Sequence, residues 1–142
     1  MISGSMQLDP ATGITVDQVG EGQRELTGVY IDDETAHKAA RGRGCLCLVI
    51  QAVPGTSVPE ATFDELADVV SDAYYGMAGS ITRGMRAALM SANQSLYEAN
   101  QQAGDENRIV AGLGCVVLRG EEAYVAEIGP VMVTLIREGQ IA

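Results

Sequence analysis

The sequence has few of the residues from which zinc sites and nucleic-acid sites are made. His37 is its only histidine, which excludes a histidine-rich zinc site. Nine lysine and arginine residues are outnumbered by 19 aspartate and glutamate residues, so the formal net charge is −10 at pH 7. A protein this acidic repels phosphates, which argues against nucleic acid and anionic membranes as partners.

Long hydrophobic runs and targeting signals are missing as well. No apolar run is long enough to cross a bilayer, and the N-terminus has no charged-then-apolar signal segment. Residues 1–20 are small, polar and turn-rich, and we expect a loose leader there. Residues 21–142 are enough for a single domain with its own hydrophobic core.

Cysteine is scarce, and its count is odd. Three cysteines without a secretion signal favour a reducing, cytoplasmic compartment. Cys45 and Cys47 alternate with apolar residues in CLCLVI, so both are expected on one face of a strand. If Cys115 lay on a neighbouring strand, three thiolates could bind zinc with one further ligand. The C-x-x-C spacing of zinc knuckles is missing, however, so buried structural thiols are the preferred interpretation. Nothing in the sequence supports a pairing of a cysteine nucleophile with a histidine base.

The hydrophobic pattern predicts two helices between two groups of strands. The run at 45–52 is continuously apolar, which is typical of a central strand that is covered on both faces. Turns at 119–122 and 129–130 divide the C-terminal part into three strands. The predicted strands are Leu26–Ile31, Cys45–Ala52, Cys115–Leu118, Ala123–Ile128 and Val131–Ile136.

Two amphipathic helices are predicted in the middle of the chain. Thr62 and Glu65 have the spacing of a capping box, so the first helix is expected to begin at Thr62. A connection at Gly76–Gly79 follows it, and Ser80 is expected to cap a second helix that ends near Gln102. The apolar stripes are Phe63, Leu66, Ala67, Val70 and Tyr74 on the first helix, and Ile81, Met85, Leu89, Ala92, Leu96 and Ala99 on the second.

This order of elements predicts the fold class. Helices grouped between runs of strands indicate an α+β fold, in which an antiparallel helix pair packs on one face of a mainly antiparallel sheet.

The C-terminal segment GLGCVVLRGEEAYVAEIGPVMVTLIREGQ, Gly112 to Gln140, resembles the metal-dependent protein phosphatases of the protein phosphatase 2C type. In that family a strand opening with Gly-Thr-Thr leads to a strand ending in Val-Gly-Asp-Ser-Arg, and another strand and a short turn follow. Ser91–Tyr97 is similar to the family's second long helix, which has an Ala-Asn pair. The resemblance covers the order of elements from Val29 onward. It implies half or more of an α/β/β/α sandwich.

The residues that hold metal in that family are replaced here. A buried family strand ends in Asp-Gly-Met-Gly-Gly, and its Asp helps to hold two divalent ions, Mn or Mg. In LVIQAVPG the Asp position is Gln51, Ala52 and Pro54 replace glycines, and only Gly55 is kept. Pro130 takes the second acidic position. The family's Asn-Glu-Asp run has no counterpart in RELTGVY (24–30). A neutral amide is a poor ligand for a hard cation, so no catalytic, cofactor or metal residue is predicted.

Other candidate residues have simpler interpretations. Asp32, Asp33 and Glu34 could bind a cation weakly, but no further acidic ligand has a diagnostic spacing, so a solvated loop containing an exposed His37 is preferred. Gly76–Gly79 resembles the phosphatase glycine motif but follows a helix. Gly112–Gly114 resembles a phosphate loop but lacks a following helix.

Two functions remain open at this point. The first is a catalytically inactive phosphatase 2C-like domain that acts as an interaction or regulatory module. The second is a divergent metal-dependent serine/threonine phosphatase, either with a site rebuilt from Asp32, Asp33, Asp72 and Glu127 or with metal ligands from a longer protein.

A homodimer or larger homo-oligomer is the expected assembly, with another protein as the alternative partner. Strands such as CLCLVI and VMVTLI are apolar on both sides, so a sheet with helices on one face leaves an apolar face to be covered. A second copy related by a two-fold axis can stack its sheet on that face.

Overall fold

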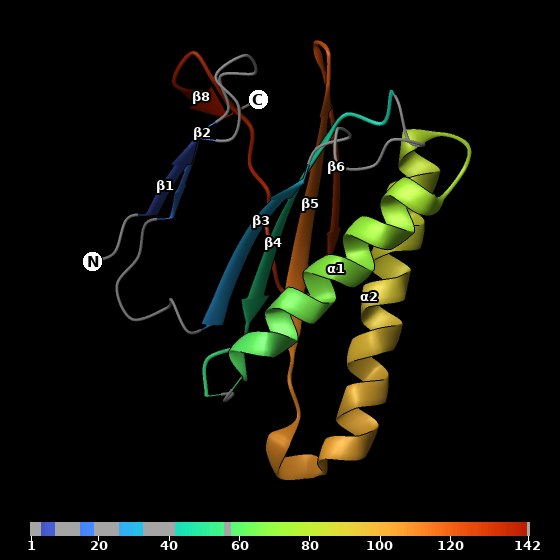
Figure 1. Ribbon diagram of the computed structural model, residues 1–142. Helices are drawn as coiled ribbons and strands as arrows, with labels where there is room; N and C mark the ends of the chain where they lie inside the picture. Colours follow the sequence, from blue (N-terminus) through green and yellow to red (C-terminus); the bar gives the residue numbers. More distant parts are fainter. Residues whose placement is uncertain (1–3, 8–14, 19–25, 33–41, 56–57, 142) are drawn as a thin grey trace.

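A four-stranded antiparallel sheet with two helices forms the body of the protein (Figure 1). The structure is a computed structural model and describes residues 4–7, 15–18, 26–32, 42–55 and 58–141. The predicted α+β class is confirmed. The main elements are β3 (Thr27–Asp32), β4 (Cys45–Ala52), α1 (Glu60–Gly76), α2 (Ile81–Ala103), β5 (Ala111–Arg119) and β6 (Glu122–Ile128).

The strand order β3-β4-β5-β6 follows the chain, and every neighbouring pair is antiparallel. Leu48 is paired with Tyr30 on β3 and with Cys115 on β5. Because partners in register point to the same side, these residues share one face, here called the first face. Gln51 is paired with Thr27 and Gly112, and these positions belong to the opposite side, here called the second face.

Both helices cover the first face (Figure 1). The four alternate residues of β4 that face them are 0–2 % exposed, so the predicted central strand is confirmed on this side. Each fully buried large apolar side chain contributes roughly 1.5–3 kcal/mol, which makes this layer the stable part of the molecule. The stripe predicted on α1 is entirely buried. The largest fully buried side chains are Tyr74, Ile50, Met85, Val70, Val117 and Cys115.

The capping box predicted at Thr62 is wrong. Helix α1 begins at Glu60 with Pro59 as its N-cap, and no side chain caps it. The Thr62 N–H donates to the Pro59 carbonyl over 2.9 Å, which places Thr62 inside the first turn. Proline favours this earlier start because its φ of −59° is preset for a helix entry.

The start of α2 agrees with prediction, but the end of its apolar stripe does not. Ser80 accepts a hydrogen bond from the Arg83 N–H over 3.2 Å, as an N-cap does. The predicted stripe is buried as far as Leu96, whereas Ala99 is exposed. The last turns of α2 extend past the sheet, so nothing in the sheet lies against them (Figure 1).

The strand predicted at 131–136 is wrong over most of its length. Only Ile136–Arg137 (β7) are in a strand, paired with Gln140–Ile141 (β8). Residues 131–135 cross the second face instead, where the Val133 side chain lies against Gly114. No described strand pairs with this segment, so its apolar alternation does not produce a ladder.

Three smaller elements complete the description. Gly4–Gln7 (β1) and Thr15–Gln18 (β2) pair as antiparallel strands, which the pattern of residues 1–20 did not predict. The short 3-10 helix η3 (Asp105–Asn107) links α2 to β5. In the described part of the chain, neither helix is long and apolar enough to cross a membrane.

Candidate functional site

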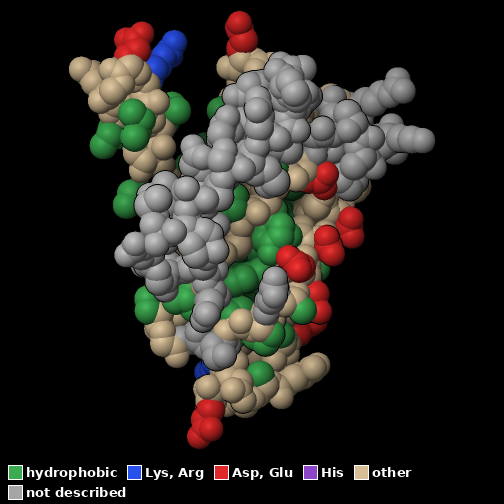
Figure 2. Space-filling view, turned by 60° about the vertical axis from the view of Figure 1, so that its left-hand side comes forward, with side chains coloured by type: hydrophobic (Ala, Val, Ile, Leu, Met, Phe, Trp, Pro, Cys, Tyr) green, Lys and Arg blue, Asp and Glu red, His purple; other side chains and the backbone are tan. Residues whose placement is uncertain are grey.

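The second face of the sheet is an apolar surface that is only partly covered. Cys47, Val49 and Gln51 of β4 are only half-buried there, so the prediction that this strand is covered on both faces holds for the first face only. Val125 of β6 is 53 % exposed. Figure 2, which turns the left-hand side of Figure 1 toward the viewer, shows hydrophobic side chains in the middle of the view next to acidic side chains.

Gln51 and Pro130 come together on the second face. Gln51 is the register partner of Gly112, and the two positions therefore point to the same side. The Pro130 carbonyl oxygen lies 2.8 Å from the place that a Cβ on Gly112 would occupy. Glycine at 112 is required because any side chain would collide with that backbone. The two positions that resemble acidic positions of the phosphatases are thus neighbours, and they provide an amide and a backbone carbonyl.

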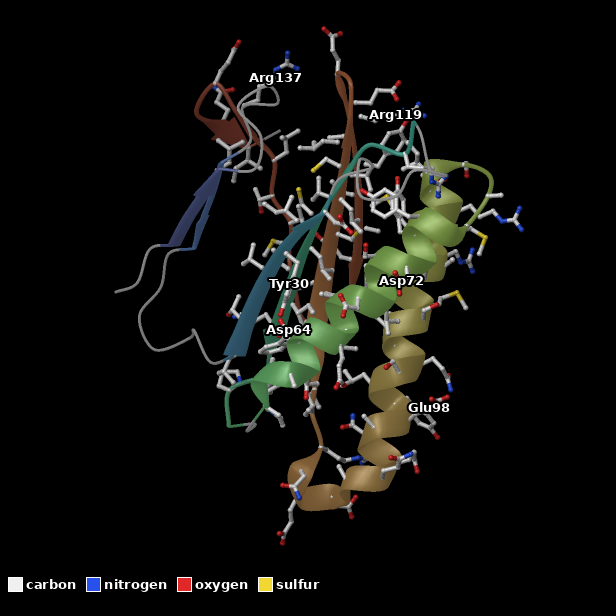
Figure 3. The ribbon with its side chains drawn as sticks, viewed as in Figure 1. Tyr30, Asp64, Asp72, Glu98, Arg119 and Arg137 are labelled. Atoms are coloured by element: carbon white, nitrogen blue, oxygen red, sulfur yellow. The ribbon has the colours of Figure 1, made fainter. Side chains whose placement is uncertain are left out.

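The candidate carboxylates are divided between the two sides of the sheet. Asp32, at the end of β3, accepts a short hydrogen bond from the Ser71 hydroxyl of α1 on the first face. Glu127 is on the second face, where it accepts from the Val133 N–H over 2.5 Å. Asp72 is exposed on α1 (Figure 3). Asp33, Glu34 and His37 lie outside the described residues. Within the described ranges, no three His, Cys, Asp or Glu residues are placed to hold a metal ion together.

The three cysteines do not meet on one side of the sheet. Cys45 and Cys47 share the second face, as predicted, but Cys115 is the partner of Leu48 and points to the first face. Cys115 is fully buried, and burial raises the pKa of its thiol to about 12. A hydrogen bond from the Cys45 side chain lowers the pKa of Cys47, against the opposing effect of burial. The register therefore separates one inert thiol from a pair of thiols.

Arg43 is a structural residue that sequence reasoning missed. Its guanidinium is buried and donates to the Gly79 carbonyl over 2.8 Å and to the Tyr74 carbonyl over 3.0 Å. It also lies over the Tyr74 ring, with Cζ 4.7 Å from the ring centroid. A cation at the C-terminal end of a helix interacts favourably with the helix dipole. Arg43 thus connects the start of β4 to the end of α1, and Gly84 of α2 leaves room for it.

The first face has one more polar contact near Asp32. The Tyr75 hydroxyl lies 3.0 Å from the Asp32 carbonyl and 2.8 Å from the Gly44 carbonyl. Burial and the negative charge of Asp32 both raise the pKa of Tyr75, so its hydroxyl stays protonated and acts as a donor. These contacts attach the end of β3 to α1 and contain no reactive group.

The glycine motifs do not form ligand loops. Gly76–Gly79 contains the end of α1 and the connection to α2, as predicted. Gly112 and Gly114 are inside strand β5, so they are not part of a loop.

A shallow groove of about 290 Å³ separates α2 from the outer edge of β6. Its walls are mainly apolar, with Arg86 on the helix and Glu127 on the strand as its charged side chains. No group of catalytic residues converges there.

Comparisons of the chain with models of protein families, with curated proteins and with solved structures found no match.

Proposed function

We propose that this chain is a catalytically inactive domain of the protein phosphatase 2C type that acts as an interaction or regulatory module. The observation that supports it is the placement of Gln51 and Pro130 beside Gly112. The two positions that resemble acidic positions are neighbours on the second face, yet neither has a carboxylate.

The chemistry of the family explains why this matters. Two divalent ions can activate water and neutralise a phosphate only where oxygen ligands, mainly carboxylates, hold both ions. Asp32 and Asp72 lie on the helix side of the sheet, whereas Glu127 lies on the second face. Their separation favours the inactive domain over a divergent phosphatase with a rebuilt site.

A manganese titration followed by an aryl phosphate assay tests this proposal. The wild-type chain should show no stoichiometric manganese site of micromolar affinity and no manganese-dependent hydrolysis. The double variant Gln51→Asp/Pro130→Asp should gain manganese binding, because it places two carboxylates beside Gly112. Asp72→Asn is the matched control and should change nothing.

Two results would contradict the inactive domain. One is a micromolar manganese site in the wild-type chain. The other is manganese-dependent turnover that Asp32→Asn or Glu127→Gln abolishes, since either substitution would identify a working carboxylate ligand.

The interaction surface in this proposal is the second face, and its occupant is a second copy of the chain. The segment 131–135 crosses this face with Met132 81 % exposed and Leu135 61 % exposed. Large exposed apolar side chains beside a half-covered sheet are typical of association surfaces. A two-fold axis would bring two such faces together as the inner layers of a sandwich.

Light scattering at low micromolar concentration tests the assembly. The wild-type chain should have the mass of a dimer or larger oligomer, and Met132→Glu should shift it toward the monomer. Tyr97→Glu is the control, because Tyr97 is also an exposed apolar side chain, 57 % exposed, but lies on α2 and not on the second face. A clean monomer of the wild-type chain would show that the second face is covered in another way.

A reducing, cytoplasmic compartment is part of the same proposal. No disulfide joins any of the three cysteines, and reduced thiols persist where glutathione and thioredoxin maintain them.

A further inference from the structure

The groove between α2 and β6 lies along the edge of a strand rather than on one face of the sheet. β6 is the last strand in the order β3-β4-β5-β6, and no strand of the described residues pairs with its outer side. Four consecutive residues of β6, Val125 to Ile128, line the groove. Successive residues of a strand point to opposite faces, so a space that four in a row line borders the edge of the strand. The groove therefore runs beside the backbone of β6, with α2 as its other wall.

The hairpin between β5 and β6 fixes which main-chain groups of β6 point outward. Arg119 and Glu122 are register partners on either side of a two-residue turn, so they form the hydrogen-bonded pair that closes the hairpin. Hydrogen-bonded and non-hydrogen-bonded pairs alternate from there along an antiparallel ladder. The N–H and C=O groups of Ala123, Val125 and Glu127 therefore point away from β5.

β6 lacks the features that usually keep another strand from adding to an edge. Natural edge strands are protected by lysine, proline, bulges or free charges. β6 contains no lysine or proline, and its register with β5 is continuous to Ile128. Its two charged side chains are engaged within the chain. Glu122 accepts from the Arg119 guanidinium over 3.2 Å, and Glu127 accepts from the Val133 N–H over 2.5 Å. This edge is therefore suited to an additional strand.

The helix wall of the groove selects apolar side chains. Met85 and Leu89 of α2 and Ile128 of β6 line it, and Met90, also in the wall, is 60 % exposed. Alternate side chains of a strand added to β6 would point toward α2 and remove this apolar surface from water.

Arg86 adds a charge requirement to the same wall. It is exposed on α2 and lines the groove, and the ion pairs formed between described residues do not include it. Glu127, the other charged residue of the groove, is held by the Val133 N–H. A carboxylate on an added strand would thus complement the cation of the groove.

We propose that the outer edge of β6 binds an extended peptide segment of another protein, added antiparallel to β6, with apolar side chains and one carboxylate toward α2. Main-chain hydrogen bonds to β6 would provide affinity, and the groove would select the alternate side chains. A second copy of β6 fits less well, because antiparallel pairing places both α2 helices on the same side of the joined sheet, so two walls that carry the same Arg86 charge would face each other. This interaction goes beyond the proposed function, since it uses neither the second face nor phosphate chemistry.

Fluorescence anisotropy of a labelled peptide tests the edge. The probe is the amidated peptide Ile-Thr-Glu-Val-Ile-Thr, whose first, third and fifth side chains would face α2. We expect saturable binding to the full chain. The second and fourth residues would be opposite outward-pointing residues of β6, so N-methylation of both should weaken binding about tenfold or more by removing two hydrogen bonds. N-methylation of the third and fifth residues is the matched control and should change little.

Variants of the chain test the groove. Arg86→Glu should weaken binding about fivefold to tenfold, because it replaces an exposed ion pair with a repulsion of similar size. A peptide with lysine in place of its glutamate should restore binding to this variant. Arg83→Glu is the matched control, since Arg83 is exposed on α2 but does not line the groove, and it should bind like the wild type. Val125→Pro removes an outward N–H and should weaken binding about tenfold, while the ladder to β5 stays intact.

Several outcomes would overturn the proposal. These are absence of saturation at millimolar concentration, equal binding of the two methylated peptides, and equal losses in Arg83→Glu and Arg86→Glu. Loss of peptide binding in Met132→Glu would place the peptide on the second face instead. Dissociation of an oligomer by Val125→Pro would show that the edge pairs with a second copy. Circular dichroism checks that each variant folds, and if Val125→Pro does not, the two methylated peptides decide with the wild-type chain.

Discussion

The two faces of the sheet are made by the same strands but have different surroundings. Both contain valines and cysteines from the same strands, β4 and β5. On the first face two helices exclude water, and Ile50 and Cys115 are fully buried. On the second face the segment 131–135 crosses the strands, and Cys47 and Val49 remain half-buried. The layer that packs on each face of a strand therefore decides whether the side chains on that face are buried in a core or remain accessible to partners.

The largest expected difference between the faces is in thiol reactivity. At pH 7 iodoacetamide should alkylate Cys47 at least roughly a thousandfold faster than Cys115, because only the thiolate reacts and the pKa of Cys115 is raised to about 12. Raising the pH through the lowered pKa of Cys47 should saturate its rate, while the rate at Cys115 keeps increasing. Mass spectrometry of timed digests measures both. Equal rates at pH 7 would remove the distinction between the faces.

Neighbouring residues of β4 should differ in their contribution to stability. Ile50→Ala, on the first face, should lower the free energy of unfolding by about 2–5 kcal/mol because it leaves a cavity in a closed core. Val49→Ala, on the second face, should cost less, roughly 1 kcal/mol, since part of the side chain is already exposed. Urea unfolding of both substitutions, each made in the Met132→Glu variant that is expected to favour the monomer, gives both values. A similar loss for both substitutions would indicate that the second face is closed.

Two glycines should respond to alanine with opposite signs. A Cβ on Gly84 would lie 2.1 Å from Nη2 of Arg43, so Gly84→Ala should displace this buried side chain and destabilise the fold by roughly 1–3 kcal/mol. Gly76, at the end of α1, has open space around it, and Gly76→Ala should stabilise by about 0.4–1 kcal/mol. Thermal unfolding measures both shifts. Stabilisation by Gly84→Ala would mean that Arg43 does not hold the helix pair to β4.

The smallest effect is expected at the rim of the first face. Tyr30 donates to the Asp64 carboxylate over 2.8 Å, and both side chains lie between β3 and α1 (Figure 3). Water can replace an exposed hydrogen bond, so Tyr30→Phe should cost no more than about 0.5–1 kcal/mol. Urea unfolding detects this change. If Tyr30→Phe lowered the free energy of unfolding more than Ile50→Ala does, the contacts at the rim would stabilise the first face more than its buried core does.

Local patterns in the sequence were enough to predict the elements of the first face. The strand at 45–52, the stripe of α1 and the Ser80 cap depend on residues that are close in sequence, and the structure confirms all three. The fold class follows from the order of these elements. Cys45 and Cys47 share a face because strands repeat every two residues. The start of α1 was mispredicted because two local signals, Pro59 and the Thr62–Glu65 spacing, compete within one turn.

Contacts between distant residues decided the rest. A shift of one residue in the pairing of β4 with β5 would have moved Cys115 to the second face beside Cys47, and nothing near either cysteine in sequence specifies that register. The approach of Pro130 to Gly112 and of Arg43 to Gly79 likewise joins segments that only the folded chain brings together. The sequence by itself determined which residues form strands and helices, because periodicity is a local property. Only the tertiary structure decided which face each residue occupies and what covers it, because packing and register depend on partners far along the chain.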